Sequence, residues 1–185
     1  MEEEKSTKQG LEQEQIQNHK QELDWASKTC DLMFKTLSNL GMQPKKNEDG
    51  AITVWYQGLR LYMGFTGYYV RIWHWGWAGI EENDPNIPKI REAINTANYH
   101  CFGTTVVLDK PNDKGMIAFH SISDILLHDA FPDNETYVRS VLDSFSYVKE
   151  EVISNFKLID ARQKEARNNR RPVGFTNADT TDSNE

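Results

Sequence analysis

Cysteine is scarce in this sequence and long apolar runs are missing, and both facts narrow what kind of protein it encodes. Among 185 residues there are two cysteines, Cys30 and Cys101, which have no metal-type spacing and fall within helical apolar patterns, as small hydrophobic residues do. No stretch approaches the apolar length that crosses a bilayer. The first residues, Met1 to Lys5, lack the basic start and apolar run of a signal peptide. We therefore expect a soluble protein of the reducing cytoplasm.

Positive charge is also in short supply. Lys and Arg number 21 against 28 Asp and Glu, a net charge of −7, which argues against nonspecific binding to nucleic acid because such binding needs a basic surface. A local exception lies near the C-terminus, where Glu165 is surrounded by five basic residues: Arg162, Lys164, Arg167, Arg170 and Arg171. These cations suit the C-terminal end of a helix dipole, and an interaction tail is the alternative. We expect no nucleic-acid partner and no membrane partner.

Motifs with a known catalytic mechanism are absent. The sequence has no G-x-S-x-G, no P-loop lysine and no dinucleotide-binding glycine pattern. His74 is expected at a sheet edge in a structural role. His128 lies four residues after Asp124, a spacing that would give half of a metal site on a helix, but the chain offers no second Cys or His pair to complete it. We therefore expect no enzyme, no cofactor and no metal; an uncharacterised enzyme using His120, His128 and Asp124 is the alternative.

Large apolar residues concentrate in the middle of the chain. Among residues 1–15 they are limited to Met1 and Leu11, and from 162 to 185 to Val173 and Phe175. Ends so poor in apolar residues bury too little surface to fold by themselves. We predict a single domain over residues 16–161, a disordered or fraying tail over 1–15 and a disordered polar tail over 162–185.

Three helices are predicted from apolar residues that recur three and four positions apart. They cover about 16–40, 87–101 and 134–159. Gly41 follows the first helix where a C-terminal cap belongs, and Asp133 is placed to cap the N-terminus of the third. Apolar and β-branched residues predict strands over 104–108 and 116–121, while 122–127 fits either a strand or a short helical turn.

Three further strands follow the first helix and are joined by two-residue loops, Gln57-Gly58 and Thr66-Gly67, in which Gly stands second. Such tight loops fix the register of the strands. The first loop pairs Tyr56 with Leu59, Val54 with Leu61 and Ile52 with Met63. The second pairs Phe65 with Tyr68, Met63 with Val70 and Leu61 with Ile72. One sheet face then carries only apolar and aromatic residues: Ile52, Val54, Tyr56, Leu59, Leu61, Met63, Phe65, Tyr68, Val70 and Ile72.

The same register places the candidate binding residues on the opposite face: Trp55, Arg60, Tyr62, Tyr69, Arg71, Trp73 and Trp75. Arg60 is expected opposite both Trp55 and Trp73, where its guanidinium stacks on two indoles, each contact contributing about 0.5–1 kcal/mol at an exposed site. Arg71 is expected opposite Tyr62. Trp, Tyr and Arg are favoured at interface hot spots. Other interpretations stay open, because aromatic residues also pack across strands, the closing helix could cover this face, and two copies of the chain could join through it.

The elements follow the order α-β-β-β-α-β-β-α, which predicts a two-layer α+β domain with an antiparallel sheet packed on helices. Together with the spacing of Asp49-Gly50 and Gly58 around the first strand, this order resembles the YbjN-like bacterial sensory transduction regulators over about residues 11–162. That family is similar in fold to the type III secretion chaperones. The resemblance implies a non-enzymatic protein-binding module, often dimeric among the chaperones, with no catalytic residues to carry over. The Trp73-His74-Trp75-Gly76-Trp77 run matches neither family.

These patterns favour a cytoplasmic, chaperone-like or regulatory module. It would bind an unidentified protein partner through the aromatic and arginine face, and a homodimer is a further option. The alternative from another class is a small-molecule sensor whose ligand stacks among Trp73, Trp75 and Trp77.

Overall fold

The computed structural model describes residues 2–168, and their side chains from 17 to 167. Within this range the chain forms three helices and six strands. They are, in order, α1 (Glu2–Asn39), β1 (Lys45–Lys46), β2 (Ile52–Tyr56), β3 (Leu59–Thr66), β4 (Tyr69–Glu81), α2 (Ile87–His100), β5 (Thr105–Leu108), β6 (Met116–Leu126) and α3 (Asn134–Asn168). The predicted α+β class and element order are confirmed. The two-residue strand β1 was not predicted, and the ambiguous stretch after Ser121 continues β6.

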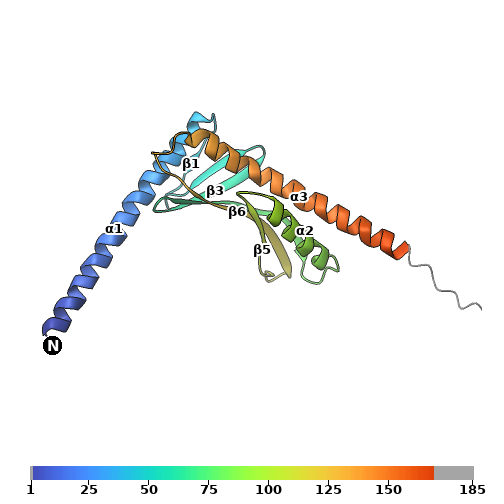
Figure 1. The fold of residues 1–185 in the computed structure, drawn as a ribbon, viewed down its shortest axis with the longest axis horizontal. Helices are drawn as coiled ribbons and strands as arrows, with labels where there is room; N and C mark the ends of the chain where they lie inside the picture. Colours follow the sequence, from blue (N-terminus) through green and yellow to red (C-terminus); the bar gives the residue numbers. More distant parts are fainter. Residues whose placement is uncertain (1, 169–185) are drawn as a thin grey trace, which may run out of the picture.

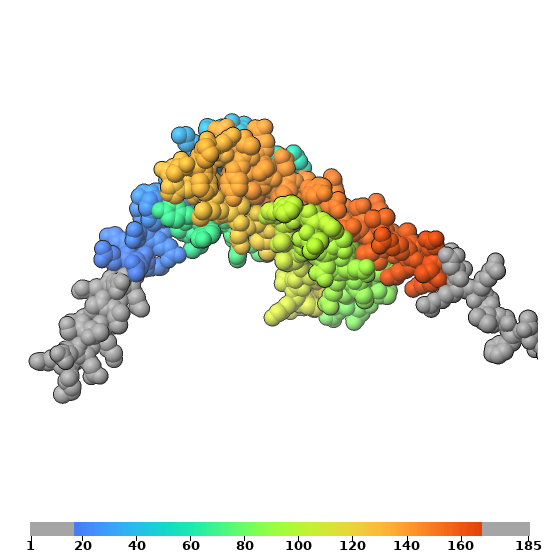
Figure 2. All heavy atoms as spheres, in the orientation of Figure 1, coloured from blue at the N-terminus to red at the C-terminus, as the bar shows by residue number. Residues whose placement is uncertain are grey.

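The six strands form one antiparallel sheet in the order β1-β2-β3-β4-β6-β5. The helices pack on one of its faces (Figure 1). The C-terminal half of α1 and the N-terminal half of α3 lie over β2, β3 and β4, and α2 lies over β5 and β6. Figure 2 shows α2 packed against α3. The fold therefore has two layers, one of helices and one of sheet.

The hairpin between β2 and β3 has the predicted register. Tyr56 pairs with Leu59 and Val54 with Leu61. The two loop residues, Gln57 and Gly58, have φ values of 47° and 80°. Two consecutive positive φ angles are typical of the type I′ turn, whose twist matches that of the flanking strands.

The hairpin between β3 and β4 differs from the prediction by two residues. Thr66 pairs with Tyr69 and Phe65 with Val70, so the loop consists of Gly67 and Tyr68, not of Thr66 and Gly67. Gly67 has a φ of 56° and stands first in the loop, as in a type II′ turn. Because side chains alternate with a period of two, this shift changes the cross-strand partners but leaves every residue on its predicted face.

The core lies between the sheet and the helices in two clusters. The first joins α1, the N-terminal half of α3 and the antiparallel meander β2–β4. Its fully buried side chains include Met33, Leu37, Ile52, Leu61, Met63, Val70, Ile72, Leu142 and Phe145. The second joins α2, β5, β6 and the middle of α3, and is built from Ile94, Ala97, Cys101, Val106, Phe119, Val148 and Val152. Burial of these apolar groups is the main force that holds the two layers together.

The predicted helix caps are formed. The Asp133 carboxylate accepts a hydrogen bond from the backbone N–H of Thr136 at 2.9 Å, and this bond lowers the pKa of Asp133. At the end of α1, Gly41 has a φ of 79°, and the N–H of Met42 donates to the carbonyl of Leu37 at 3.1 Å. Both ends therefore satisfy backbone groups that a helix terminus leaves free.

Both long helices extend past the predicted domain boundaries. α1 begins at Glu2, inside the segment predicted as an N-terminal tail, and α3 continues to Asn168, past residue 161. The domain boundaries therefore stay a prediction. The rest of the predicted C-terminal tail, residues 169–185, lies outside the described residues.

Candidate functional site

The sheet face opposite the helices, called here the open face, carries all seven predicted binding residues. On β2–β4 every second side chain points to it, and the residues between them enter the helix-covered core. The proposal that the closing helix covers this face is wrong, because α3 packs through Val141 and Phe145 against the other face.

Three aromatic side chains of the open face are largely in solvent. Trp55 is 66% exposed, Tyr69 63% and Trp75 49%, while Tyr62 and Trp73 are half-buried. β6 adds Leu126, which pairs with Tyr69 and is 41% exposed. These side chains stand on β2, β4 and β6, and the half-buried Tyr62 and Trp73 share the same face. Several large exposed apolar groups on one face of a soluble protein mark a contact site more often than single exposed side chains do.

Arg71 is held by Asp124, which was not among the predicted binding residues. Its Nε and Nη2 donate to the two carboxylate oxygens of Asp124 on β6 at 2.6 and 2.7 Å. This two-pronged hydrogen bonding lowers the pKa of Asp124 and raises that of Arg71. Arg71 lies opposite Gly64 on β3, not opposite Tyr62 as predicted. Its charge is therefore satisfied within the sheet.

Trp73 and Trp75 stack on each other with ring centroids 5.8 Å apart and an angle of 14° between the rings. Trp73 pairs across the strands with Tyr62, and its ring reaches over Gly64, where an added Cβ would lie 3.0 Å from the indole Cη2. Trp75 meets the buried ring of His120 edge-on at 4.8 Å. Neighbours on β3 and β6 thus fix the orientation of this indole pair.

Arg60 has one of its two predicted partners. It pairs with Trp55 as expected. Its guanidinium carbon lies 5.1 Å from the ring centroid of Tyr62, two residues along the same strand. The prediction that Arg60 faces Trp73 is wrong, because the β3–β4 loop begins one residue later than the sequence pattern indicated and Trp73 pairs with Tyr62.

A depression on the open face has a volume of about 600 Å³ and is lined by Gly64, Thr66, Tyr69, Arg71, Trp73 and Asp124. β3 contributes the small residues Gly64 and Thr66, and the other lining groups are two aromatic rings and the Arg71–Asp124 pair. The combination of aromatic walls with a few fixed polar groups is typical of ligand and peptide sites.

Trp77 is separated from Trp73 and Trp75 by an irregularity in β4. The pairing of β4 with β6 shifts between His74 and Ala78, and Gly76 has a φ of 55°. The Nδ1 of His120 accepts the N–H of Gly76 at 2.9 Å and so holds the bulge. As a result Trp77 packs on the helix side, where it contacts Phe119 and the ammonium group of Lys149. The three tryptophans therefore do not form one binding site.

The three residues of the alternative enzyme hypothesis are spread along β6 and the loop that follows it. Asp124 is paired with Arg71, and His120 contacts Trp75. His128 belongs to an aromatic cluster with Trp25, Tyr68 and Phe131. At about 3.3 Å per residue along a strand, His120 is roughly 20 Å from Leu126 at the end of β6, and His128 follows in the loop, so His120 and His128 do not meet.

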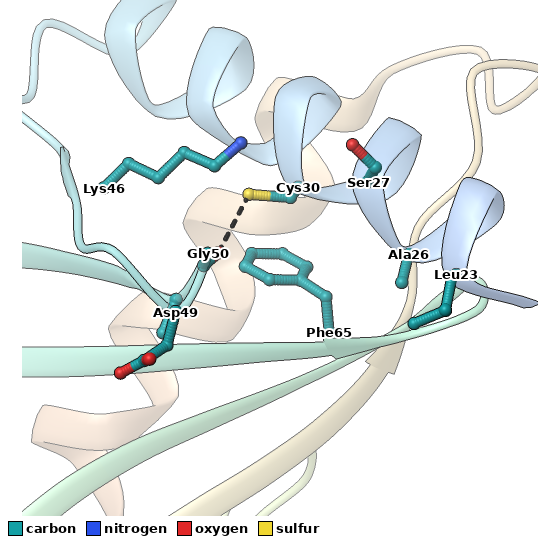
Figure 3. Close-up of a pocket in the computed structure, with 9 residues that line it drawn as sticks. Leu23, Ala26, Ser27, Cys30, Lys46, Asp49, Gly50 and Phe65 are labelled. Atoms are coloured by element: carbon teal, nitrogen blue, oxygen red, sulfur yellow. Dashed lines mark hydrogen bonds between the residues drawn. The ribbon is translucent and has the colours of Figure 1, made fainter.

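Cys30 lines another cavity, of about 270 Å³, which lies between α1, β3 and the loop before β2 (Figure 3). Its thiol donates to the carbonyl of Gly50 at 3.2 Å. Burial raises the pKa of Cys30, and the nearby Lys46 only partly offsets this. Burial also raises the pKa of Cys101. A raised pKa favours the thiol form of both cysteines over the more nucleophilic thiolate. No group of three or more potential metal ligands occurs among the described residues.

Comparison with known proteins bears on the fold. Among solved structures, the chain is similar to YbjN from E. coli, described as a proposed transcription regulator, with a TM-score of 0.49 and 14% identity over 68% of this chain and 90% of that chain. A likeness at this level says nothing of function. No family model and no curated protein matches the chain. Across residues 2–168, none of the helices is apolar enough over a sufficient length to cross a membrane.

Proposed function

We propose that the protein is a non-enzymatic binding module that binds a protein partner through the open face. The observation that carries this proposal is the exposure of Trp55, Tyr69 and Trp75 on one sheet face while three helices cover the other. Burying large, stiff aromatic side chains gains much apolar area at a small entropic cost, which is why they dominate interface energies.

The fixed geometry of the face supports the same proposal. Its residues stand on strands, and Asp124 and Gly64 set the positions of Arg71 and Trp73 before any partner binds. A site that is ordered in advance loses less entropy on association than a flexible one. We propose that such a module acts in the cytoplasm in a chaperone-like or regulatory role.

The test is capture of a partner by purified, tagged protein. Wild type is compared with Trp55→Ala/Trp75→Ala and with a control, Tyr99→Ala/Phe102→Ala, which removes two aromatic residues that are 85% and 92% exposed but lie outside the open face. A protein retained from native-host lysate by wild type and the control, and lost by the first variant, is then purified and titrated against all three. Circular dichroism checks that each variant is folded.

The proposal fails if the purified partner binds Trp55→Ala/Trp75→Ala as tightly as wild type. It also fails if the control variant loses the partner to the same extent, since the effect would then belong to exposed aromatic residues in general. If wild type and both variants retain the same lysate proteins in the same amounts, the result also counts against protein binding by this face.

The depression beside Trp73 favours one second candidate, a small-molecule sensor. Its 600 Å³ volume suits a small ligand, which would stack on Trp73 and hydrogen-bond to the Arg71–Asp124 pair. A metabolite panel that quenches the tryptophan fluorescence of wild type but not of Trp73→Phe would support this candidate. If no metabolite changes the tryptophan fluorescence of wild type, the small-molecule sensor is excluded.

A further inference from the structure

Charge is unevenly distributed over the open face. On β1, β2 and β3 the register places two cations and no carboxylate there; the residues are Lys45, Thr53, Trp55, Arg60, Tyr62, Gly64 and Thr66. The Asp124 carboxylate on β6, which shares this face, is occupied by Arg71, and the Asp109 carboxylate lies 3.5 Å from Nε2 of His120. One end of the face is thus positive on a chain whose net charge is −7. We call this end, formed by Lys45, Trp55, Arg60 and Tyr62, the basic corner.

The two arginines of the face differ in what their guanidinium groups still offer. Arg71 uses two N–H groups on Asp124. Arg60 is exposed, makes no ion pair within residues 17–167, and lies over the ring of Tyr62 with Trp55 as its cross-strand neighbour. A ring against the flat side of a guanidinium orients it and leaves its N–H edge free to donate in parallel to two oxygens.

The free edge of Arg60 suits a carboxylate, and the surrounding rings suit apolar side chains. Nucleic acid also combines negative charge with flat rings, but its binding rests on neutralising several phosphates. The basic corner supplies only Lys45 and Arg60 in an acidic protein, so the observations favour a polypeptide.

The geometry points to an acidic partner: the basic corner binds a segment of a protein in which Asp or Glu alternates with apolar or aromatic residues, and Arg60 is the specificity-determining residue that receives the carboxylate. This inference rests on the proposed function and names the chemistry of its partner. Because like charges repel across the interface, the same corner excludes basic segments.

The experiment uses three capped peptides with Glu, Gln or Lys alternating with Leu and Phe, titrated against the full chain. Binding is followed through the indole N–H signals of ¹⁵N-labelled protein. The Glu peptide is expected to shift the Trp55 signal and to bind at least about tenfold more tightly than the Lys peptide, with affinity that falls as salt is added. Arg60→Glu should weaken the Glu peptide by about tenfold or more, and Arg60→Lys by less.

The matched control is Arg91→Glu, which makes the same charge change at an exposed position of α2 and should leave the affinity within about twofold. Equal binding of the Glu, Gln and Lys peptides, no binding of any, or unchanged affinity in Arg60→Glu overturns the inference. So does a (dT)₁₀ oligonucleotide that binds at Trp55 when the Glu peptide does not. If Trp55→Ala/Trp75→Ala loses the captured partner while Arg60→Glu keeps it, the inference fails and the proposed function stands.

Discussion

Asn98 of α2 hydrogen-bonds to both backbone groups of Val106 on the edge strand β5: its Nδ2 donates to the Val106 carbonyl at 2.9 Å, and its Oδ1 accepts the Val106 N–H at 2.8 Å. β5 pairs with β6 on one side only. The side-chain amide thus takes the place of a neighbouring strand at this position. Free strand edges promote pairing with other chains, and capping them prevents it.

Asn98→Ala is expected to lower the free energy of unfolding by about 1–3 kcal/mol, because it leaves two backbone groups of a buried residue without partners. Urea titration measures the change. Asn95→Ala, at an exposed position of the same helix, is the control and should change stability by less than about 0.5 kcal/mol. If the two variants were equally stable, the Asn98–Val106 pair would not protect the edge.

Gly64→Ala tests how the indole pair is positioned. An added Cβ would lie 3.0 and 3.2 Å from the Cη2 and Cζ3 atoms of Trp73, so the ring must move and its stack on Trp75 must change. We expect altered near-ultraviolet circular dichroism and weaker partner binding. Stability should change by no more than about 1 kcal/mol, because the half-buried ring can shift and Gly→Ala reduces the entropy of the unfolded chain. Thr66→Ala, on the same strand, should leave the spectrum unchanged; an unchanged spectrum in Gly64→Ala would contradict the close contact.

The faces of the meander could be predicted from the sequence because they depend on local information. Alternation with a period of two and the Gln57-Gly58 loop are enough to place Val54 against Leu61. The second loop was assigned wrongly because Gly67 supplies a positive φ at the first loop position as well as it would at the second. The loop begins one residue later than predicted, which shifts the pairing by two residues, an even number, so the seven predicted site residues still share a face.

The remaining features of the site depend on contacts between distant parts of the chain. The pairing of Arg71 with Asp124 requires that β6 lie beside β4, which no local pattern states. The separation of Trp77 from Trp75 arises at a bulge held by His120, 44 residues away from Gly76. The sequence indicates this bulge only through Gly76, because a Gly inside a strand often marks a bulge.

Arg71→Gln tests the role of the ion pair on the open face. Its hydrogen bonds hold the pKa of Asp124 below the usual 3.8, so this carboxylate stabilises the fold above that pH and loses the contribution as the pH falls through its lowered value. Both side chains are about half exposed, so screening by solvent keeps the effect on stability small. In Arg71→Gln the pKa of Asp124 should rise, as followed by the ¹³C signal of its carboxyl group. An unmoved pKa would show that the pair does not persist in solution.

His74 gives the fold a dependence on pH. It pairs across the strands with Ser121 on the helix side, and neither its Nδ1 nor the Ser121 hydroxyl has a hydrogen-bond partner among the described residues. Burial lowers the pKa of His74 from 6.5, and the charge of Lys149 lowers it further. The unfolded chain therefore takes up this proton at a higher pH than the folded chain does, and the free energy of unfolding must fall as the pH drops below about 6.5.

We expect wild type to lose stability between pH 7 and pH 5, and His74→Gln to lose markedly less over the same range, because it removes the group that must be charged on unfolding and neutral in the fold. Urea titrations at half-unit steps of pH measure both curves. His19→Gln, at an exposed position of α1, is the control and should follow wild type. Parallel curves for wild type and His74→Gln would mean that His74 takes up its proton at the same pH in the folded and unfolded chains, and the pH dependence would then have to come from other groups.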